Sequence, residues 1–418
     1  MTLGPQRICL ITPGHLSSNP RIVKEADALS AAGHSVTVIS SRFSQNADAA
    51  DRAFAGRPWT SRRDAAFGPL ASRPAYLWQS LSRHAARKAL VAYPDNVRFA
   101  ERACHPAAPA LTAAAVAVKA DLYIAHYTAA LPAAAHAAKR HGALFGFDAE
   151  DFHPGDLPDA PEHTFEKRII DRIERHYLPR AAHLTAASPG IAEAYAERYG
   201  IRMPDVVLNV FGLTPGAPCM AREDVQSPSL YWFSQTIGPG RGLESAAGAI
   251  GLARSAPHLY IRGTGSKDYI RNIQSIAARH GAGSRLHVLP ACLPSELEER
   301  GMAYDVGLAL EIPLTHNREL ALSNKLFSYL SSGLAVVLSD TTAQKRIAPE
   351  LEGAVRLVAA GDPVALAAAV DELVLDRSRL SAMRATAKRL ARDRFNWEIE
   401  GRVLVDAVNA ALARHKRA

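Results

Sequence analysis

Cysteine is scarce in this chain of 418 residues, and its spacing excludes the sites that cysteine usually builds. Cys9, Cys104, Cys219 and Cys292 lie far apart, without a CxxC motif or a paired histidine. Disulfide scaffolds and closed zinc sites need closer clusters. We therefore expect no disulfide, no zinc site and a reducing compartment.

Long apolar runs are missing as well. Prolines and charged residues interrupt the alanine-rich stretch 104–136, whereas a membrane-spanning helix needs about 20 predominantly apolar residues in a row. The first residues, MTLGPQRICLITPG, lead directly into an expected strand and lack the pattern of a secretory signal. We expect neither a membrane-spanning helix nor a leader.

Two familiar nucleotide-binding signatures are also absent. The first expected strand, residues 7–12, is followed by PGHLSSNPR rather than by GxGxxG, which argues against a Rossmann-type oxidoreductase. A later glycine-rich loop, TIGPGRG at 236–242, lacks the order GxxxxGK[ST] of a P-loop. A phosphate site in this chain must therefore be built in another way.

What the chain does have is an excess of positive charge and enough length for two domains. A net charge of +8 and a pI near 9.4 favour anionic partners. Such partners include nucleotides, phosphates, nucleic acid and an anionic membrane surface.

Strands and helices alternate along most of the sequence. Segments such as SVTVIS (35–40) and DLYIAHY (121–127) predict strands between helical patterns, and this order predicts α/β domains with parallel, doubly wound sheets. The pattern pauses in a stretch rich in proline and glycine near residue 212 and then restarts. We place the boundary there, with a first domain over 1–212 and a second over 213–399.

The second domain is organised around residues 304–340. This stretch predicts a strand, a loop, a helix that Gly333 ends, and a further strand. Ser323 takes the N-cap position of the helix and is followed by Asn324 and Lys325. Backbone N–H groups at a helix N-terminus attract anions, and Lys325 adds positive charge. The alternative is an ordinary strand–helix–strand unit in which Ser323 only caps the helix.

The glycine-rich loop at 236–242 follows another expected strand of the same domain. Small residues such as Gly240 let a phosphate approach the backbone, and Arg241 can bind it with two parallel hydrogen bonds. This loop and the helix start at 323–325 together predict a diphosphate site.

Polar side chains follow the strands of the first domain. His126 lies at the end of one strand, and Asp148 and Glu150 follow the next. Because the carboxyl ends of parallel strands meet at one edge of a sheet, we expect these side chains to lie together. A histidine with carboxylates suits general acid–base work or the binding of sugar hydroxyls, whereas a structural histidine is the alternative. The spacing matches no closed metal site.

A further polar group follows the first strand and includes Ser17, Ser18, Asn19 and Arg21. Its position at a carboxyl strand end suits ligand binding. Turn formation alone is the alternative explanation.

Residues 57–102 form a basic segment with interleaved aromatic residues. Within it, residues 76–92 predict a helix with apolar side chains on one side and Arg83 and Arg87 on another. A basic amphipathic helix indicates contact with a membrane surface. The alternative is a solvated helix that packs on its own domain.

In their order and spacing, these motifs resemble the retaining GT-B glycosyltransferases of family 4, which use nucleotide sugars. The SSNPR loop followed by AAGHSVTVIS resembles the first strand–helix–strand unit of that family, and SQTIGPGRGLE resembles its donor-phosphate loop. DVGLAL with SNKLFSYLSSGLAVVLSD resembles its donor signature, and RFNWE the segment before its last helix. The resemblance covers nearly the whole chain apart from about residues 42–105.

The resemblance implies two Rossmann-like domains facing a cleft, with the last helix, 400–418, returning to the first domain. The donor would be a UDP- or GDP-type sugar, bound in the second domain through Gly240, Arg241 and residues 323–325. The first domain would hold the acceptor, a glycan or a lipid-linked molecule. No metal or other cofactor would be needed, and the anomeric configuration would be retained.

By the same resemblance, His126 corresponds to a polar position near the donor sugar, and Asp148 and Glu150 would line the acceptor side together with residues 17–21. The implied role is synthesis of cell-surface polysaccharide or glycolipid in the cytoplasm or at the inner membrane face. Apart from the resemblance, the basic segment 57–102 leaves membrane contact as a hypothesis, and no nucleic-acid partner is expected.

One position departs from the family pattern. Family members commonly carry two glutamates eight positions apart, the second of which binds the donor ribose, but Ser328 stands at that second position. Glu311 and Glu319 have the same spacing out of register, so ribose recognition either passes to one of them or is altered. A catalytically inactive GT-B subunit and a GT-B sugar-nucleotide epimerase are the alternatives to a transferase.

Overall fold

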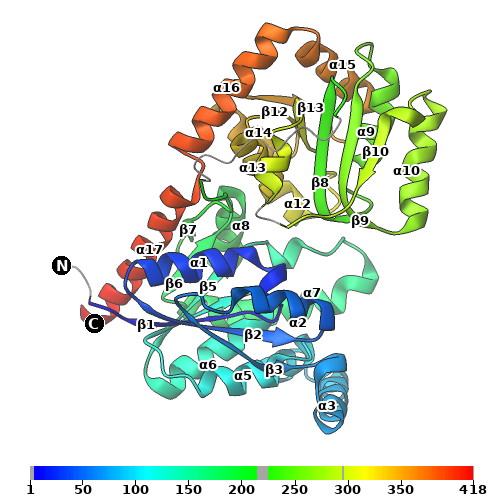
Figure 1. Ribbon diagram of the computed structural model, residues 1–418. Helices are drawn as coiled ribbons and strands as arrows, with labels where there is room; N and C mark the ends of the chain where they lie inside the picture. Colours follow the sequence, from blue (N-terminus) through cyan, green and yellow to red (C-terminus); the bar gives the residue numbers. More distant parts are fainter. Residues whose placement is uncertain (1–3, 214–224, 294–295, 418) are drawn as a thin grey trace. The chain divides into compact units, whose positions relative to one another are not determined.

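The computed structural model describes residues 4–213, 225–293 and 296–417, and the chain forms two compact units (Figure 1). Unit 1 comprises residues 1–208 and 400–418, and unit 2 comprises residues 209–399. Cys9, Cys104 and Cys292 form no disulfide with one another, and Cys219 lies outside the described residues.

The boundary between the units falls at residue 208, slightly before the position 212 expected from the sequence. Two hydrogen bonds explain the difference. The backbone N–H of Leu208 donates to Glu400 Oε2 of unit 1 at 2.7 Å. The carbonyl of Phe211, in contrast, accepts from the backbone N–H of Trp397 at 2.9 Å, within unit 2.

Unit 1 is built on a parallel sheet with the strand order β3-β2-β1-β4-β5-β6-β7. This order confirms the doubly wound α/β fold expected from the sequence. Its strands are β1 (Arg7–Ile11), β2 (Ser35–Arg42), β3 (Thr60–Ala66), β4 (Leu122–His126), β5 (Leu144–Ala149), β6 (His183–Ala186) and β7 (Asp205–Val206).

Helices cover both faces of this sheet, with α1 and α2 on one face and α5 and α6 on the other (Figure 1). The helices of unit 1 are α1 (Pro20–Ala31), α2 (Gln45–Ala50), α3 (Arg73–Ala92), α4 (Val97–Cys104), α5 (Ala108–Val116), α6 (Leu131–His141), α7 (Thr164–Tyr177) and α8 (Pro189–Tyr199), and the last helix, α17 (Trp397–Arg417), begins in unit 2 and continues in unit 1.

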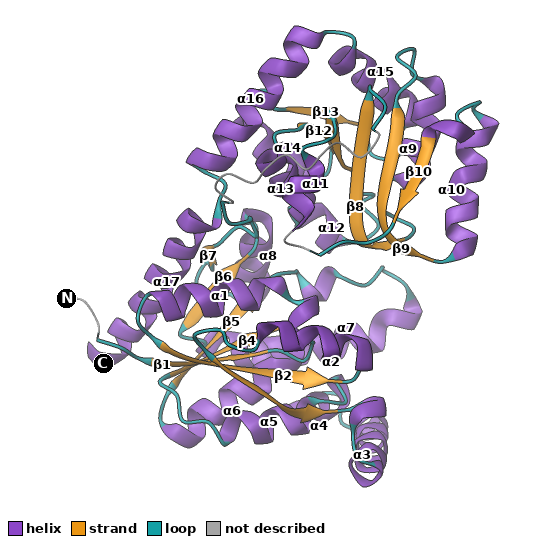
Figure 2. Cartoon of the chain, viewed as in Figure 1, coloured by secondary structure: helices purple, strands orange, loops and turns teal. Residues whose placement is uncertain are grey.

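Unit 2 has a second parallel sheet, with the order β10-β9-β8-β11-β12-β13 (Figure 2). Its strands are β8 (Ser229–Ile237), β9 (His258–Gly265), β10 (Leu286–Leu289), β11 (Val306–Ala309), β12 (Ala335–Ser339) and β13 (Val355–Val358). Its helices are α9 (Leu243–Leu252), α10 (Lys267–Arg279), α11 (Leu297–Gly301), α12 (His316–Leu320), α13 (Asn324–Ser332), α14 (Thr342–Ile347), α15 (Pro363–Val374) and α16 (Arg377–Asp393).

The stretch 304–340 forms the predicted strand, loop, helix and strand. Strands β11 and β12 are buried along their whole length, as expected of apolar strands in the middle of a parallel sheet. Gly333 ends α13 in the left-handed conformation, with φ of 67°, which other residues adopt only at a cost. This arrangement brings the N-terminus of α13 to the carboxyl edge of the sheet.

The basic segment 57–102 is less exposed than the sequence indicates. Part of it is β3, which pairs with β2 at the edge of the sheet. Trp59 is buried and donates a hydrogen bond to Asp27 at 2.8 Å. Only α3 and the residues that follow it expose large apolar side chains in this segment.

Across the described ranges, no helix combines the length and the apolar character that crossing a membrane requires.

Candidate functional site

Two loops of unit 2 meet at the carboxyl edge of its sheet, because β8 and β11 are neighbouring strands. The first is the glycine-rich loop between β8 and α9, and the second connects β11 to α12. Gly242 of the first loop has φ of 70°, and a Cβ there would lie 2.5 Å from Leu310 Cβ. The sequence needs glycine at this position because the two loops pack directly on each other.

Lys325, in the first turn of α13, is the central cation of this edge. It is only 7% exposed, and its Nζ lies 3.0 Å from Glu311 Oε1 and 3.4 Å from Ser323 Oγ. The ammonium group also lies 5.5 Å from the centre of the Trp232 ring, within the range of a cation–π contact. A buried ammonium group needs such partners, because an unpaired buried charge is costly.

Two arginines complete the cationic cluster. Arg318 of α12 donates to the carbonyl of Gly240, and its Nη1 lies 3.8 Å from Glu311 Oε2. Arg241 donates to Ser234 Oγ at 3.1 Å. Burial alone would raise the pKa of Glu311, but the charge and hydrogen bond of Lys325, followed by the two arginines, hold it below its usual value. Three cations therefore surround one carboxylate at this edge.

The N-terminus of α13 differs from the sequence prediction in one respect. Ser323 takes the N-cap position, with an extended backbone, but its side chain does not cap the helix. Its Oγ accepts from Lys325 instead. The Ser323 side chain therefore does not accept from the N–H groups in the first turn of α13. These groups, including that of the exposed Asn324, can donate to another acceptor.

The two glutamates considered for ribose recognition lie in different surroundings. Glu311 lies among the cations just described. Glu319 of α12 accepts hydrogen bonds from the backbone N–H and the hydroxyl of Thr342, both at 2.8 Å, and so caps α14. Ser328 is buried in α13. Ribose contact by Glu311 or Glu319 stays a prediction.

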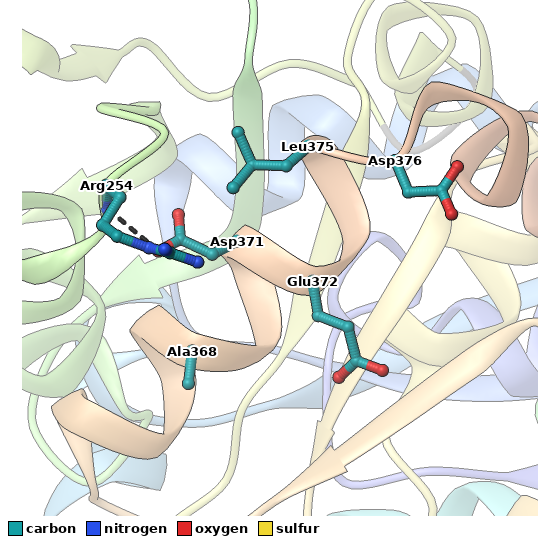
Figure 3. Close-up of a pocket in the computed structure, with 6 residues that line it drawn as sticks. All are labelled: Arg254, Ala368, Asp371, Glu372, Leu375 and Asp376. Carbon is teal, nitrogen blue, oxygen red and sulfur yellow. Dashed lines mark hydrogen bonds and ion pairs between the residues drawn. The ribbon is translucent and has the colours of Figure 1, made fainter.

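A surface depression of about 570 Å³ on unit 2 lies among three acidic side chains of α15 and the residues after it (Figure 3). Their oxygens are already engaged. Asp371 accepts from the backbone N–H of Arg254 and Ser255 at 2.9 and 2.8 Å. Glu372 pairs with two arginines, and Asp376 caps α16. The carboxylates of the depression therefore serve the fold of unit 2, and we assign no ligand to it.

At the carboxyl edge of the unit 1 sheet, the predicted site residues form a buried ionic cluster. Arg21 of α1, fully buried, binds both oxygens of Asp148 at 2.6 and 2.8 Å and donates to the Val207 carbonyl at 2.9 Å. Thr185 donates to Asp148 as well, at 2.6 Å. Burial alone would raise the pKa of Asp148, but Arg21 holds it well below its usual range.

His126 belongs to the same cluster and is 1% exposed. Its Nε2 lies 3.0 Å from Glu25 Oε2, and its Nδ1 lies 3.4 Å from Asp148 Oδ2. Burial lowers the pKa of His126, but Glu25 and Asp148 together raise it above the usual value. Both ring nitrogens thus face carboxylates within the unit. A part of this histidine in transfer stays a prediction.

Among the described residues, Glu25, His126 and Asp148 form a group whose ligand atoms lie close enough to hold a metal ion. Both oxygens of Asp148, however, already accept from Arg21. A divalent cation would have to lie beside a guanidinium group, so the residues do not fit a metal site.

Glu150, which follows β5, differs from Asp148 in the direction of its pKa shift. Burial raises its pKa to about 7, and the charge of Asp151 adds to the shift. A carboxyl group that titrates near neutral pH suits proton transfer. Its role on the acceptor side stays a prediction.

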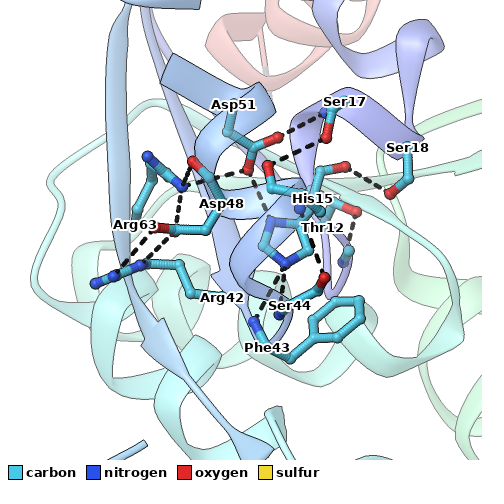
Figure 4. A network of polar contacts seen from close by, with 12 residues as sticks. Thr12, His15, Ser17, Ser18, Arg42, Phe43, Ser44, Asp48, Asp51 and Arg63 are labelled. Atoms are coloured by element: carbon cyan, nitrogen blue, oxygen red, sulfur yellow. Dashed lines mark hydrogen bonds and ion pairs between the residues drawn. The ribbon is translucent and has the colours of Figure 1, made fainter. Parts of the chain in front are cut away.

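The loop between β1 and α1, where acceptor contact was predicted, is held by hydrogen bonds within unit 1 (Figure 4). Asp51 accepts from the backbone N–H of Ser17 at 2.8 Å and pairs with His15 Nδ1 at 2.9 Å. Ser18 Oγ donates to the His15 carbonyl at 2.9 Å, and Asn19 Oδ1 caps α1. These side chains shape the loop, and acceptor contact by them stays a prediction.

Several residues of these clusters were not predicted from the sequence. Glu25 lies one helical turn after Arg21, and this i,i+4 spacing was the available signal. Glu174 of α7 is fully buried and accepts hydrogen bonds from Thr128, Tyr195 and Tyr199. Its partners come from separate elements, so no local pattern marks it.

Comparisons with known proteins agree with this geometry. Residues 18–210 match the family described as glycosyl transferase 4-like domain. Among solved structures, HepE from Anabaena in complex with UDP and glucose has a TM-score of 0.69 at 15% identity, covering 97% of this chain and 100% of that one. The comparison with curated proteins gave no match.

Two further structures are similar. Sucrose-phosphate synthase from Thermosynechococcus elongatus has a TM-score of 0.73 at 14% identity, over 98% of this chain and 100% of that chain. WaaG, a glycosyltransferase involved in lipopolysaccharide biosynthesis, has a TM-score of 0.57 at 14% identity, over 95% and 98%. At these identities the likeness shows the fold. Residues 18–210 thus match the glycosyl transferase 4-like domain, and the chain as a whole has the GT-B fold, which confirms the resemblance to GT-B glycosyltransferases stated from the sequence. Retention of the anomeric configuration stays a prediction.

Proposed function

We propose that this protein is a retaining glycosyltransferase that moves a sugar from a nucleotide-diphosphate sugar to a glycan or lipid-linked acceptor. The single observation that carries the proposal is the cationic cluster of unit 2, where Lys325 in the first turn of α13, Arg318 and Arg241 all act on the carboxylate of Glu311. Charged donors and helix N–H groups are the components that bind a diphosphate.

The same cluster explains how the leaving group would depart. When the bond to the sugar breaks, negative charge develops on the diphosphate, and fixed cations at that place stabilise it. In this proposal Arg241, Lys325 and the amides at 323–325 perform that task, so the reaction needs neither a metal nor another cofactor. HepE is described in complex with UDP and with UDP-glucose, which supports a UDP-type donor here.

Retention of the anomeric configuration follows the family 4 resemblance of the sequence. In this proposal unit 2 binds the donor and unit 1 binds the acceptor. WaaG acts in lipopolysaccharide biosynthesis, and this supports a role in the synthesis of surface polysaccharide or glycolipid.

We further propose that the enzyme works at the cytoplasmic face of a membrane, through α3. This helix contains no acidic residue, and Leu77, Leu81, His84, Lys88 and Val91 form a stripe of exposed side chains at helical spacing. Leu81 and Val91 are 69% and 76% exposed. An apolar stripe on a basic helix fits an anionic lipid surface.

Three arginines of the segment 57–102 are paired within unit 1 and are therefore less available for contact with lipid. Arg87 pairs with Glu166 at 2.5 Å, and Arg62 pairs with Asp64 at 2.5 Å. Arg63 pairs with Asp48. These side chains serve unit 1 itself, and the buried Trp59 cannot act as an interfacial anchor.

A thermal-shift screen of UDP- and GDP-sugars without added metal tests the proposed function. We expect at least one nucleotide sugar to raise the melting temperature, because a ligand that binds only the folded state stabilises it. Absence of any shift, with and without magnesium, would contradict nucleotide-sugar binding. For a donor that binds, product analysis without acceptor separates an epimerase from a transferase, and binding without turnover on any acceptor would indicate an inactive subunit.

A further inference from the structure

Glu311 is the one described carboxylate that lies among the cations proposed to bind the donor, and its geometry is that of a counter-ion. One oxygen lies 3.0 Å from Lys325 Nζ, and the other lies 3.8 Å from Arg318 Nη1. Its side chain is 16% exposed and that of Lys325 is 8% exposed, so water screens the pair only weakly. Among the described residues, Glu311 is the carboxylate that pairs with Lys325, so its removal would leave the buried ammonium group without that partner.

The backbone of Glu311 is fixed independently of its carboxylate. Its N–H donates to Ser339 Oγ at 2.9 Å, and the preceding Leu310 packs against Gly242. The side chain can therefore change its partners while the loop keeps its place. The carboxylate occupies part of a cationic surface that, by the proposed function, belongs to the donor diphosphate.

The charges of the cluster and of the donor indicate that Glu311 and a diphosphate compete for the same cations. Within the cluster, the three cations and the carboxylate of Glu311 leave a net charge of two positive units, and each of the two phosphates of a nucleotide sugar carries one negative charge. A diphosphate that approaches Lys325 must either displace the carboxylate or lie beside a like charge. Either event weakens binding, since like charges at short range repel.

We propose that Glu311 is an internal counter-anion of the diphosphate subsite. In the absence of donor it neutralises Lys325 and Arg318, and the donor diphosphate competes with it for these cations. This inference rests on the proposed function, because it takes the cationic cluster as the place of the diphosphate. In this proposal Glu311 lowers the affinity for the donor diphosphate and does not bind the ribose.

Calorimetric titration of the full chain with two probes, inorganic diphosphate and UDP, tests the proposal. Glu311→Gln keeps an oxygen that can accept from Lys325 but removes the competing charge. We expect the variant to bind both probes about tenfold more tightly than the wild type, and we expect the gain to shrink as salt rises. A melting curve of the variant checks that it is folded.

A matched control is Glu372→Gln, which also removes a carboxylate paired with two arginines of unit 2 but lies on α15. This variant should bind both probes as the wild type does. If Glu372→Gln tightens binding as much as Glu311→Gln, net charge alone explains the effect and the proposal fails.

The other outcomes separate this proposal from the proposed function. Weaker UDP binding by Glu311→Gln, with unchanged inorganic diphosphate binding, would overturn the proposal in favour of ribose contact. Unchanged binding of both probes would also overturn it. Wild-type protein that binds inorganic diphosphate but not UDP, GDP or their sugars would contradict the proposed function while leaving the effect of Glu311 measurable. If neither protein binds either probe, both proposals fail.

Discussion

His126 and Lys325 are both buried basic side chains, but their partners differ. His126 lies between the carboxylates of Glu25 and Asp148, which Arg21 also binds, so its polar partners all lie within unit 1. Lys325 shares the carboxylate of Glu311 with Arg318, so in this cluster the cations outnumber the carboxylate. An excess of positive charge favours the binding of an anionic ligand, whereas a cluster whose charges pair with one another favours a structural role.

Replacement of His126 tests this distinction. We expect His126→Gln to destabilise unit 1 by about 3–5 kcal/mol, because two buried carboxylates would then share Arg21 alone. Urea unfolding measures the loss, and His84→Gln, on the exposed face of α3, is the matched control. If His126→Gln keeps wild-type stability while turnover falls by about a hundredfold, the histidine acts on the substrate instead.

Glu150 predicts a pH dependence of stability. Its pKa is raised from 4.5 to about 7 in the folded protein, so folding takes up a proton between these values. The stabilising contribution is complete below about pH 4.5 and is lost as the pH rises through about 7, a loss of up to about 3 kcal/mol. Denaturant unfolding across this range should show a steeper decline for the wild type than for Glu150→Gln. Parallel profiles would contradict the shift.

At the scale of elements, α3 is unusual because few of its residues are buried and several large apolar side chains are exposed. Gln79, Ala86 and Leu90 are its buried residues, whereas Leu77 and Leu81 are 57% and 69% exposed. A helix that served only to cover its own unit would expose polar side chains. The exposed stripe therefore supports membrane contact.

Co-sedimentation with anionic vesicles at low salt measures this contact. We expect Leu77→Glu with Leu81→Glu to leave most of the protein in the supernatant, because both the apolar contact and the charge attraction are reduced. Val364→Glu, on an exposed apolar residue of α15 in unit 2, should still sediment. If the wild type itself stays in the supernatant, α3 is a solvated helix and a soluble acceptor becomes the better proposal.

In the glycine-rich loop, substitution of Gly242 should cause a steric clash in addition to the strain of its backbone conformation. Gly33 and Gly242 both have positive φ, but a Cβ at Gly33 would meet nothing within 4 Å, whereas one at Gly242 would collide with Leu310. Gly33→Ala should cost about 1 kcal/mol of stability. Gly242→Ala should cost clearly more and weaken UDP binding, as unfolding curves and calorimetry would show. Equal losses in the two variants would mean that the loops do not need this close approach.

Much of this architecture could be predicted from local patterns. The alternation of apolar strands and helices, with Gly333 after α13, predicts the parallel sheets, and the order of loose motifs predicts the GT-B fold. The partners of each polar residue could not be predicted, because Arg21, Asp148 and Val207 come from distant parts of the chain. Glu311 and Lys325 likewise meet only once β11 and α13 are packed together.

At the scale of the whole molecule, each unit has its own sheet, its own core and its own polar edge. The helix α17 links them in sequence, since Trp397 bonds within unit 2 and Glu400 bonds within unit 1. In unit 1 the helix buries Leu404, Val408 and Leu412. Because we propose that unit 2 alone binds the diphosphate, substitutions in the unit 1 clusters should leave the affinity for UDP unchanged.

Calorimetric titration of UDP into the wild type, Arg241→Ala and Lys325→Ala tests the central claim most directly. Each substitution removes a charged hydrogen-bond donor, worth about 1.5–3 kcal/mol, so we expect the affinity to fall at least tenfold in both variants. Arg271→Ala, which removes an exposed arginine of unit 2 paired with Asp268, should bind UDP as the wild type does. Unchanged UDP affinity in both Arg241→Ala and Lys325→Ala would contradict the account.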